Sequence, residues 1–392
     1  MSLANPLVRG VGAPPVALGA AWGAAYDGRS GPLIDCSQAV PGHPPPALLA
    51  EALGRAAQAP AVARYGPIPG DPAFRAAYAA HVSARYGTEI APERVVVTAG
   101  CNQAFVAAIV ALARAGEAVL LPTPWYFNHQ MTLAMLGIEA RPLPTRPEDG
   151  FLARPEAVEA AIDDRVRALV IVSPNNPTGA VYPPATIERL FAICRERNIA
   201  LILDETYRDF LDPEAGPPHR LFGMESADTH LLSLYSFSKA YAIPGHRLGA
   251  VVAGTGMVGE LVKVIDCVQI CAPRVPQAAL AADGMIEALA PFRDETARAI
   301  AARAALFRDT IAGVPGWDLL QIGAYFAYLR HPFRGVSSRI VAEALAERMG
   351  IVALPGSFFG PAGEDFLRVA FANVGDAAVA EIGRRLSRFR LD

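Results

Sequence analysis

Lysine is nearly absent from this chain, although basic residues in general are not. Of the 35 basic residues in the 392-residue sequence only Lys239 and Lys263 are lysines, and the remaining 33 are arginines. Arginine keeps its proton and forms no imine, whereas a lysine with a lowered pKa can lose its proton and form one. Lys263, in the stretch ELVKVID, has the setting of an ordinary helix-surface residue. Lys239 is therefore the first candidate for a reactive amine.

Features that would indicate a nucleic-acid or membrane partner are also missing. The net charge is −3, which gives no electrostatic reason to expect nucleic acid or an anionic membrane. No run of 18 apolar residues predicts a transmembrane helix, and the first residues lack the charged start and apolar stretch of a signal peptide. We expect neither kind of partner.

Cysteine is scarce, and its spacing does not favour a metal site. The five cysteines form no CxxC pair, and no histidine stands at ligand spacing from Cys267 and Cys271, which are four residues apart. We therefore expect buried structural thiols, no bound metal, and a reducing, cytoplasmic setting.

Short apolar runs alternate with helical stretches through the middle of the sequence. The runs are almost continuous in apolar residues, which is typical of strands in a sheet covered by helices on both faces. The alternation favours an α/β fold with a mostly parallel sheet. Strands are expected at 95–98, 118–122, 168–174, 200–205, 230–237 and 247–253, and helices at 46–58, 72–86, 102–114 and 184–197.

The pattern changes after about residue 285. Expected elements there are helices at 291–312, 337–349 and 375–389 and strands at 324–330, near Ile351 and at 366–372. Residues 1–46 are rich in Pro and Gly and are expected to form an irregular arm. We predict a large α/β domain at 45–285 and a smaller α+β domain formed by 1–44 and 286–392.

Chemically capable side chains follow one expected strand after another. Ligands of parallel α/β sheets bind beyond the carboxyl ends of the strands, so these residues are expected to meet at one edge. They are Gly100-Cys101-Asn102, Asn175-Asn176, Asp204-Glu205-Thr206-Tyr207 and Ser236-Phe237-Ser238-Lys239.

Each of these groups has two interpretations when it is taken alone. Residues 100–102 form either a phosphate site at a helix N-terminus or a plain strand-to-helix turn. Asp204 is either the buried partner of a protonated pyridine nitrogen or the N-cap of a helix. Ser236, Ser238 and Arg247 form either a phosphate cradle or a solvated loop.

Together these motifs resemble those of fold-type I pyridoxal-phosphate enzymes, specifically the class I and II aminotransferases. The resemblance runs from about Tyr65 to Arg368, and SPNNPTG followed by SFSK-x7-R is its most specific part. It implies a mostly parallel seven-stranded sheet between helices, a smaller α+β domain, and pyridoxal 5′-phosphate as cofactor. The motifs are RYGPIPG, TAGCNQA, PTPWYFNH, SPNNPTG, DETY, SFSKAYAIPGHRLG and LRVAFAN.

The resemblance implies catalytic roles for three residues. Lys239 would carry the cofactor as a Schiff base and move a proton between the substrate Cα and the cofactor. Asp204 would keep the pyridine nitrogen protonated, so that the ring acts as an electron sink. Tyr207, together with Asn176, would donate to the phenolic oxygen of the ring.

Further cofactor contacts are implied in the same way. Tyr126, rather than its neighbour Trp125, would stack on the cofactor ring. Tyr65 would reach the phosphate of the other subunit, which implies an obligate homodimer. The implied phosphate cup consists of Gly100, Cys101, Asn102, Ser236, Ser238 and Arg247.

Arg368 is implied to pair with the substrate α-carboxylate, with Asn176 and Ala39 beside it. Ala39 stands where many relatives have glycine, and it is expected to narrow the pocket. The substrate side chain cannot be read from the sequence, and Arg274 is only a possible partner for a second carboxylate. Four aromatic residues either line a pocket for apolar donors or pack in the core, namely Tyr325, Phe326, Phe358 and Phe359.

Several residues near the motifs are expected to have structural roles. The sequence GTGMVG at 254–259 matches a dinucleotide-binding pattern, but it falls late in the α/β region and lacks an acidic residue about 20 positions on. We interpret it as a structural turn. His129 and His246 are expected to support neighbouring groups or to pack structurally.

The resemblance implies an aminotransferase that moves an amino group between an L-amino acid and a 2-oxo acid in two half-reactions. One alternative is a C–S or β-eliminating lyase on the same fold, in which Lys239 would take the Cα proton and a leaving group would depart from Cβ. The other is a non-catalytic cofactor-binding effector module, which the presence of Lys239, Asp204 and Arg368 disfavours.

Overall fold

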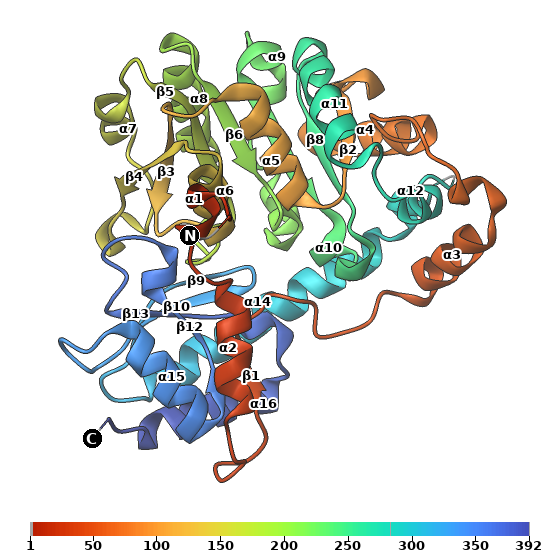
Figure 1. Cartoon of the computed structure of the whole chain (residues 1–392). Coiled ribbons are helices and arrows are strands. Elements are labelled where there is room, and N and C mark those ends of the chain that lie inside the picture. The colour runs from red at the N-terminus through yellow and green to blue at the C-terminus, as the bar shows by residue number, and fades with distance from the viewer. Residues whose placement is uncertain (1–2, 283, 392) are drawn as a thin grey trace.

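A seven-stranded sheet forms the centre of the larger part of the molecule (Figure 1). The computed structural model describes residues 3–282 and 284–391. The strand order is β2-β8-β7-β6-β5-β3-β4; β8 runs antiparallel to both of its neighbours, and the other pairs are parallel. This is the fold class that the sequence predicted. The strands are β2 (Val95–Thr98), β3 (Ala118–Thr123), β4 (Glu139–Pro144), β5 (Val166–Val172), β6 (Ala200–Asp204), β7 (Leu231–Ser236) and β8 (Gly249–Val252).

Helices cover both faces of this sheet, which explains why its strands read as continuous apolar runs. Along β5, Leu169 and Ile171 belong to one hydrophobic cluster, whereas Ala168 and Val170 belong to another on the opposite face. The first cluster includes residues from α3 (Ala47–Gln58), α4 (Pro72–Tyr86), α8 (Pro184–Glu196) and α12 (Arg274–Leu280), and the second from α5 (Cys101–Leu112), α6 (Phe127–Met135) and α11 (Thr255–Gln269).

The smaller part has its own sheet and core. Its antiparallel sheet has the order β12-β13-β10-β9, and β1 pairs with β11 in a separate two-stranded sheet. A third cluster joins the N-terminal segment to the C-terminal elements. These elements are β1 (Ile34–Asp35), β9 (Asp318–Gly323), β10 (Phe326–Arg330), β11 (Ile351–Val352), β12 (Leu354–Pro355), β13 (Phe366–Val369), α14 (Ala290–Ala312), α15 (Ser338–Met349) and α16 (Asp376–Arg388).

The N-terminal segment is not the irregular arm that its Pro and Gly content predicted. It contains α1 (Pro6–Arg9) and α2 (Pro15–Ala24), and α2 lies against the smaller part (Figure 1). Pro15 occupies the first helical position, where a missing N–H is tolerated. Gly23 allows close packing, because a Cβ there would lie 3.0 Å from the Val352 side chain. Proline and glycine here serve a helix start and a close contact.

The predicted domain limits at 45 and 285 stay a prediction, which the separate hydrophobic clusters favour. The sequence did not predict the two-residue strands β1 and β12 or the longer strands β4 and β9, and β4 and β9 both lie at the edge of their sheets. Within residues 3–282 and 284–391, no helix combines the length and apolar character that a membrane-spanning segment needs.

Candidate active site

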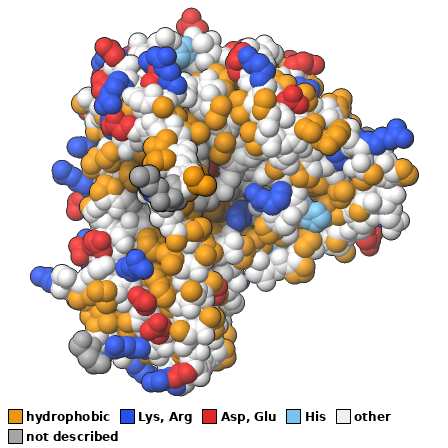
Figure 2. All heavy atoms as spheres, viewed as in Figure 1, with side chains coloured by type: hydrophobic (Ala, Val, Ile, Leu, Met, Phe, Trp, Pro, Cys, Tyr) orange, Lys and Arg blue, Asp and Glu red, His pale blue; other side chains and the backbone are white. Residues whose placement is uncertain are grey.

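A cavity of about 450 Å³ lies where strands of the large sheet end, and residues of the N-terminal segment and of β13 close its other side. Figure 2 shows the hollow, with basic side chains close to it. Every predicted site residue except Gly100 and Tyr65 lines this cavity. The predicted lining residues are Ala39, Cys101, Asn102, Tyr126, Asn176, Asp204, Tyr207, Ser236, Ser238, Lys239, Arg247 and Arg368.

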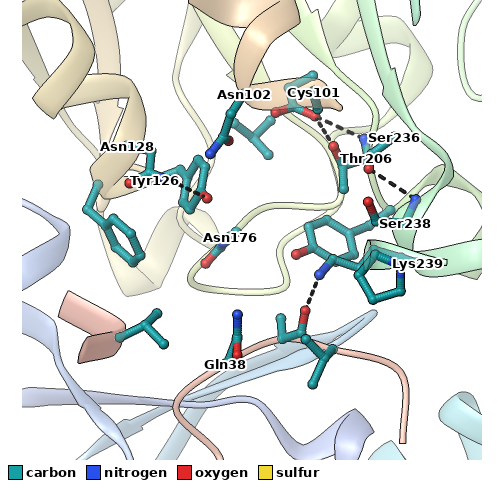
Figure 3. A pocket seen from close by; sticks show the side chains of 18 of the residues that line it. Gln38, Cys101, Asn102, Tyr126, Asn128, Asn176, Thr206, Ser236, Ser238 and Lys239 are labelled. Carbon is teal, nitrogen blue, oxygen red and sulfur yellow. Dashed lines mark hydrogen bonds between the residues drawn. The ribbon is translucent and has the colours of Figure 1, made fainter. Parts of the chain in front are cut away.

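Lys239 projects into the cavity from the short helix α10 (Phe237–Ala240), which directly follows β7 (Figure 3). Its Nζ donates a hydrogen bond to the backbone oxygen of Ala39. Burial lowers the pKa of this amine to about 8, and the positive charges of Arg247 and Arg368 act in the same direction. An amine with this pKa is partly neutral at physiological pH, as a nucleophile for imine formation must be.

One end of the cavity is built to hold an anion. The N-terminus of α5 begins after Gly100, which has φ +84° and no side-chain cap, so the first N–H groups of the helix are left for a ligand. A Cβ on Gly100 would lie 2.3 Å from Nη2 of Arg247, so only glycine lets this guanidinium come so close. Arg247 lies 3.5 Å from the hydroxyl of Ser238, and Ser236 lines the same end. This donor set fits a phosphate group.

Asp204 ends β6 and is 5% exposed. Its Oδ1 accepts hydrogen bonds from the backbone N and the hydroxyl of Thr206, at 3.0 and 2.7 Å. Its Oδ2 lies 3.5 Å from Nε2 of His129, whose ring stacks on Phe105 at 3.9 Å. A buried carboxylate that faces the cavity fits a cationic ring nitrogen. His129 stands three residues after Tyr126, a spacing that brings two side chains to the same face of a helix and could have placed it here.

Arg368 is a buried cation without an anionic partner among the described residues. It is 2% exposed, and its guanidinium carbon lies 5.1 and 5.2 Å from the ring centres of Phe326 and Phe359. It donates to Oδ1 of Asn176 at 3.3 Å and to the backbone oxygen of Ser37, while its Nε has no partner. Burial lowers the pKa of Arg368 to about 10. A carboxylate ligand would supply the missing charge.

Two tyrosines line the cavity on the side of the large sheet. Tyr126 accepts a hydrogen bond from Asn128 at 2.8 Å, and burial raises its pKa to about 12 (Figure 3). Tyr207 is 5% exposed, and burial raises its pKa well above the usual range. Trp125 lies outside this cavity and lines a small neighbouring one.

Several expected or possible site residues lie elsewhere. Tyr65 is 77% exposed and does not line the cavity of its own chain. Arg274 is also outside, because it binds Asp71 at 3.1 Å and the backbone oxygens of Ala61 and Arg64. The four aromatic residues do not line the cavity either: three are fully buried and one is partly buried, namely Tyr325, Phe326 and Phe359, and Phe358.

The structure also adds residues to which the sequence assigned no role. Gln38, which stands between Ser37 and Ala39 in the N-terminal segment, reaches into the cavity (Figure 3). Adjacency to a predicted residue was the only signal for it. The others are Val16, Ser37, Val40, Phe127, Asn128, Val172, Thr206 and Pro244.

Residues predicted to be structural lie away from the cavity. A Cβ on Gly254 would lie 1.9 Å from the backbone oxygen of Asp228, which accounts for the first glycine of GTGMVG. Lys263 is exposed and pairs with Glu260 at 2.5 Å.

The prediction of buried thiols is wrong for Cys267, which is exposed, and only partly right for Cys101 and Cys271; Cys36 and Cys194 are buried. Among the described residues no group of three or more His, Cys, Asp or Glu could hold a metal ion.

A lysine of lowered pKa, an anion cup and a buried carboxylate around one cavity together form a site that fits pyridoxal phosphate. The family model of aminotransferase class I and II matches residues 36–386, and the chain belongs to this family. It is therefore an aminotransferase that depends on pyridoxal phosphate and acts on an amino acid and a 2-oxo acid.

Relatives and solved structures agree with this assignment. The chain is 31% identical to the arginine–pyruvate transaminase of Pseudomonas aeruginosa over 82% of this chain and 81% of that protein. It is 30% identical to the valine–pyruvate aminotransferase of Mycobacterium tuberculosis over 92% of both. A single mutant of Thermus thermophilus aspartate aminotransferase matches with a TM-score of 0.89 and 26% identity, over 99% of this chain and 100% of that one. These names lend no support to a lyase or an effector module.

Proposed function

We propose that both half-reactions take place in this cavity, with Lys239 as the reactive amine and Arg368 as the binding site for the substrate α-carboxylate. The observation that carries the proposal is the spacing of these two cations. They contact the backbone oxygens of Ala39 and Ser37, which are two residues apart in one segment. An α-amino group and an α-carboxylate share one carbon, so two neighbouring cationic groups suit them.

Bound pyridoxal phosphate supplies an electron sink for the negative charge that develops when the substrate Cα loses its proton. Lys239, in its neutral form, would remove that proton, and Arg368 would hold the carboxylate so that the Cα–H bond faces the amine. Asp204 would hold a proton on the ring nitrogen. Tyr207 and Asn176 would donate to the phenolic oxygen of the ring.

The remaining predicted residues would fix the cofactor in place. The anion cup would bind its phosphate, and Tyr126 would cover one face of the ring. Ala39 would border the substrate carboxylate. The cup comprises Gly100, Cys101, Asn102, Ser236, Ser238 and Arg247.

The test is a single-turnover reaction of the cofactor-loaded enzyme with an amino acid and no 2-oxo acid acceptor. We expect about one 2-oxo acid per active site and no ammonia. Continuous release of a 2-oxo acid and ammonia would contradict transamination and support the lyase. Lys239→Ala should abolish the burst, and Lys263→Ala is the matched lysine control; an unchanged burst in Lys239→Ala would refute the role of Lys239.

We propose donors without a side-chain carboxylate, and pyruvate as a first acceptor to test, beside 2-oxoglutarate. In the described part of the chain, the basic residues that line the cavity are Lys239, Arg247 and Arg368, and each has a proposed partner in the cofactor or the α-carboxylate. None is left for a second carboxylate. The names of the two transaminases from Pseudomonas and Mycobacterium support pyruvate as an acceptor. A donor screen with both acceptors tests this proposal.

We also propose a homodimer in which Tyr65 reaches the phosphate of the other subunit. Tyr65, Val268 and Ile270 are exposed apolar residues, at 77%, 58% and 39%. The N–H of Gly66 donates to Sγ of Cys271 at 3.4 Å, so these segments lie side by side. The exposed apolar side chains of these two segments form a surface that dimerisation would cover. The mass in solution tests this, and a monomer that stays active would contradict it.

The domain limits and the location of the protein are further proposals. We propose that 45–285 form the large domain and that 1–44 and 286–392 form the small one, which limited proteolysis tests. The five free thiols support a reducing, cytoplasmic setting. We propose no nucleic-acid or membrane partner, since the net charge is −3.

A further inference from the structure

Thr206 donates twice to the same oxygen of Asp204. Its backbone N lies 3.0 Å and its hydroxyl 2.7 Å from Oδ1 of the carboxylate. The bond to the backbone N–H is a common feature of a turn that follows an aspartate. The second bond needs a hydroxyl at this position. Thr206 is half-buried and lines the cavity, so it acts at the surface that a ligand meets (Figure 3).

These two bonds occupy both lone pairs of Oδ1. The other oxygen, Oδ2, lies 3.5 Å from Nε2 of His129 and keeps capacity to accept a further hydrogen bond. Asp204 is buried, so water does not compete freely for that capacity. Thr206 thus holds Oδ1 of the carboxylate, whereas Oδ2 can still accept a hydrogen bond from a ligand.

We propose that Thr206 is a positioning residue that fixes the rotation of the Asp204 carboxylate, so that Oδ2 is directed at the ring nitrogen of pyridoxal phosphate. The proposal rests on the role of Asp204 in the proposed function. Thr206 itself touches neither the cofactor nor the reacting atoms in this account. Its side chain also hydrogen-bonds Cys101, and the double-mutant cycle below isolates the effect that passes through Asp204.

The turn itself does not depend on the hydroxyl. The N–H of Glu205 donates to the backbone oxygen of Leu234 at 2.9 Å, and the N–H of Arg208 donates to the backbone oxygen of Glu205 at 3.1 Å. Both bonds are independent of the residue type at 206. Thr206→Val has nearly the same shape and removes only the hydroxyl, whereas Thr206→Ser keeps the hydroxyl and removes a methyl group. The two variants therefore separate hydrogen bonding from packing.

The test is the dissociation constant of pyridoxamine 5′-phosphate for the cofactor-free enzyme, measured by fluorescence titration. This compound cannot form an imine with Lys239, so its affinity reports non-covalent binding alone. We expect Thr206→Val to raise the dissociation constant about tenfold, which is the typical effect of one hydrogen bond to a charged group. Thr206→Ser should stay within about twofold of the natural protein.

A double-mutant cycle then separates positioning from a general structural effect. In the Asp204→Asn background, Thr206→Val should change the dissociation constant by less than about twofold, because the amide that replaces the carboxylate offers no charged oxygen to direct at the ring nitrogen. An equal increase in both backgrounds would overturn the proposal, and so would an unchanged constant for Thr206→Val in the natural background. The thermal unfolding of each cofactor-free variant shows that it is folded.

The cycle also distinguishes a failure of the role proposed for Asp204 from a failure of the role proposed for Thr206. If Asp204→Asn alone leaves the dissociation constant unchanged, the proposed role of Asp204 fails, and the role of Thr206 fails with it. If Asp204→Asn weakens binding and Thr206→Val does not, only the inference about Thr206 is refuted.

Discussion

Replacing Arg368 with methionine is expected to stabilise the cofactor-free protein and to remove most of its activity. The guanidinium is 2% exposed, and among the described residues it has no anionic partner and its Nε has no hydrogen-bond acceptor. The folded chain therefore holds an incompletely compensated charge until a ligand arrives. Methionine keeps an unbranched side chain of similar length and removes the charge.

The size of the stabilisation follows from the pKa of Arg368. Burial lowers this pKa from its usual 12.5 to about 10, so at every pH below about 10 the charged guanidinium destabilises the folded state relative to the unfolded state. At about 1.4 kcal/mol per pKa unit, this corresponds to about 3 kcal/mol. Contacts with the rings of Phe326 and Phe359 offset about 1–2 kcal/mol of it. For a chain of this length 1 kcal/mol is roughly 1 °C in Tm, so we expect an increase of about 1–2 °C.

The loss of activity follows from the substrate carboxylate. A bidentate pair contributes two charge-assisted hydrogen bonds of about 1.5–3 kcal/mol each, so kcat/KM should fall roughly 10²–10⁴-fold. Calorimetry of the cofactor-free protein and the half-reaction with an amino acid check the two effects. Arg330→Met on the adjacent strand is the matched control, because Arg330 is partly exposed and paired with Asp318 at 3.8 Å. A Tm lowered by several degrees, or an unchanged kcat/KM, would contradict this prediction.

Three further predictions concern other groups in and behind the site. The pKa of Lys239 is about 8, so the rate at which the cofactor-free enzyme takes up pyridoxal phosphate should rise with pH through about 8; a rise centred near 10 would contradict this. Burial alone would raise the pKa of Glu205, but His219 and other partners outweigh it and bring the pKa to about 2. The ionised carboxylate therefore stabilises the fold above its usual pKa of 4.5, and urea unfolding should show this stability lost between pH 4.5 and 2 in the natural protein but not in Glu205→Gln. Gly100→Ala should weaken binding of pyridoxal phosphate at least about tenfold, because its φ is +84° and the new Cβ would lie 2.3 Å from Arg247. Gly245→Ala, which has open space around it, should leave binding unchanged.

The large sheet was predictable because its strands are buried on both faces and therefore read as apolar runs. The edge strands β4 and β9 were not predicted, because they have one free edge and accept proline and polar residues: β4 reads EARPLP, and β9 has no buried residue. The helix α2 was missed because proline and glycine are read as breakers, although here they serve a helix start and a close contact.

The candidate site was predictable where its residues lie at the carboxyl end of a strand or shortly beyond it, as Asp204 and Lys239 do. Gln38 was not predictable in this way, because only the packing of the N-terminal segment on the smaller part brings it to the cavity. The rings of Phe326 and Phe359 were considered as pocket walls, but they flank Arg368. Which surface a buried aromatic ring faces depends on tertiary packing, which the local sequence pattern does not contain.

The scarcity of lysine has a consequence for chemical labelling. Lys263 is exposed and paired with Glu260, whereas burial and two neighbouring arginines lower the pKa of Lys239 to about 8. Near pH 8 a small amine-directed reagent therefore meets two lysine side chains, and that of Lys239 is partly neutral. Borohydride treatment of the cofactor-loaded enzyme followed by proteolysis would leave the cofactor's mass on a single lysine peptide.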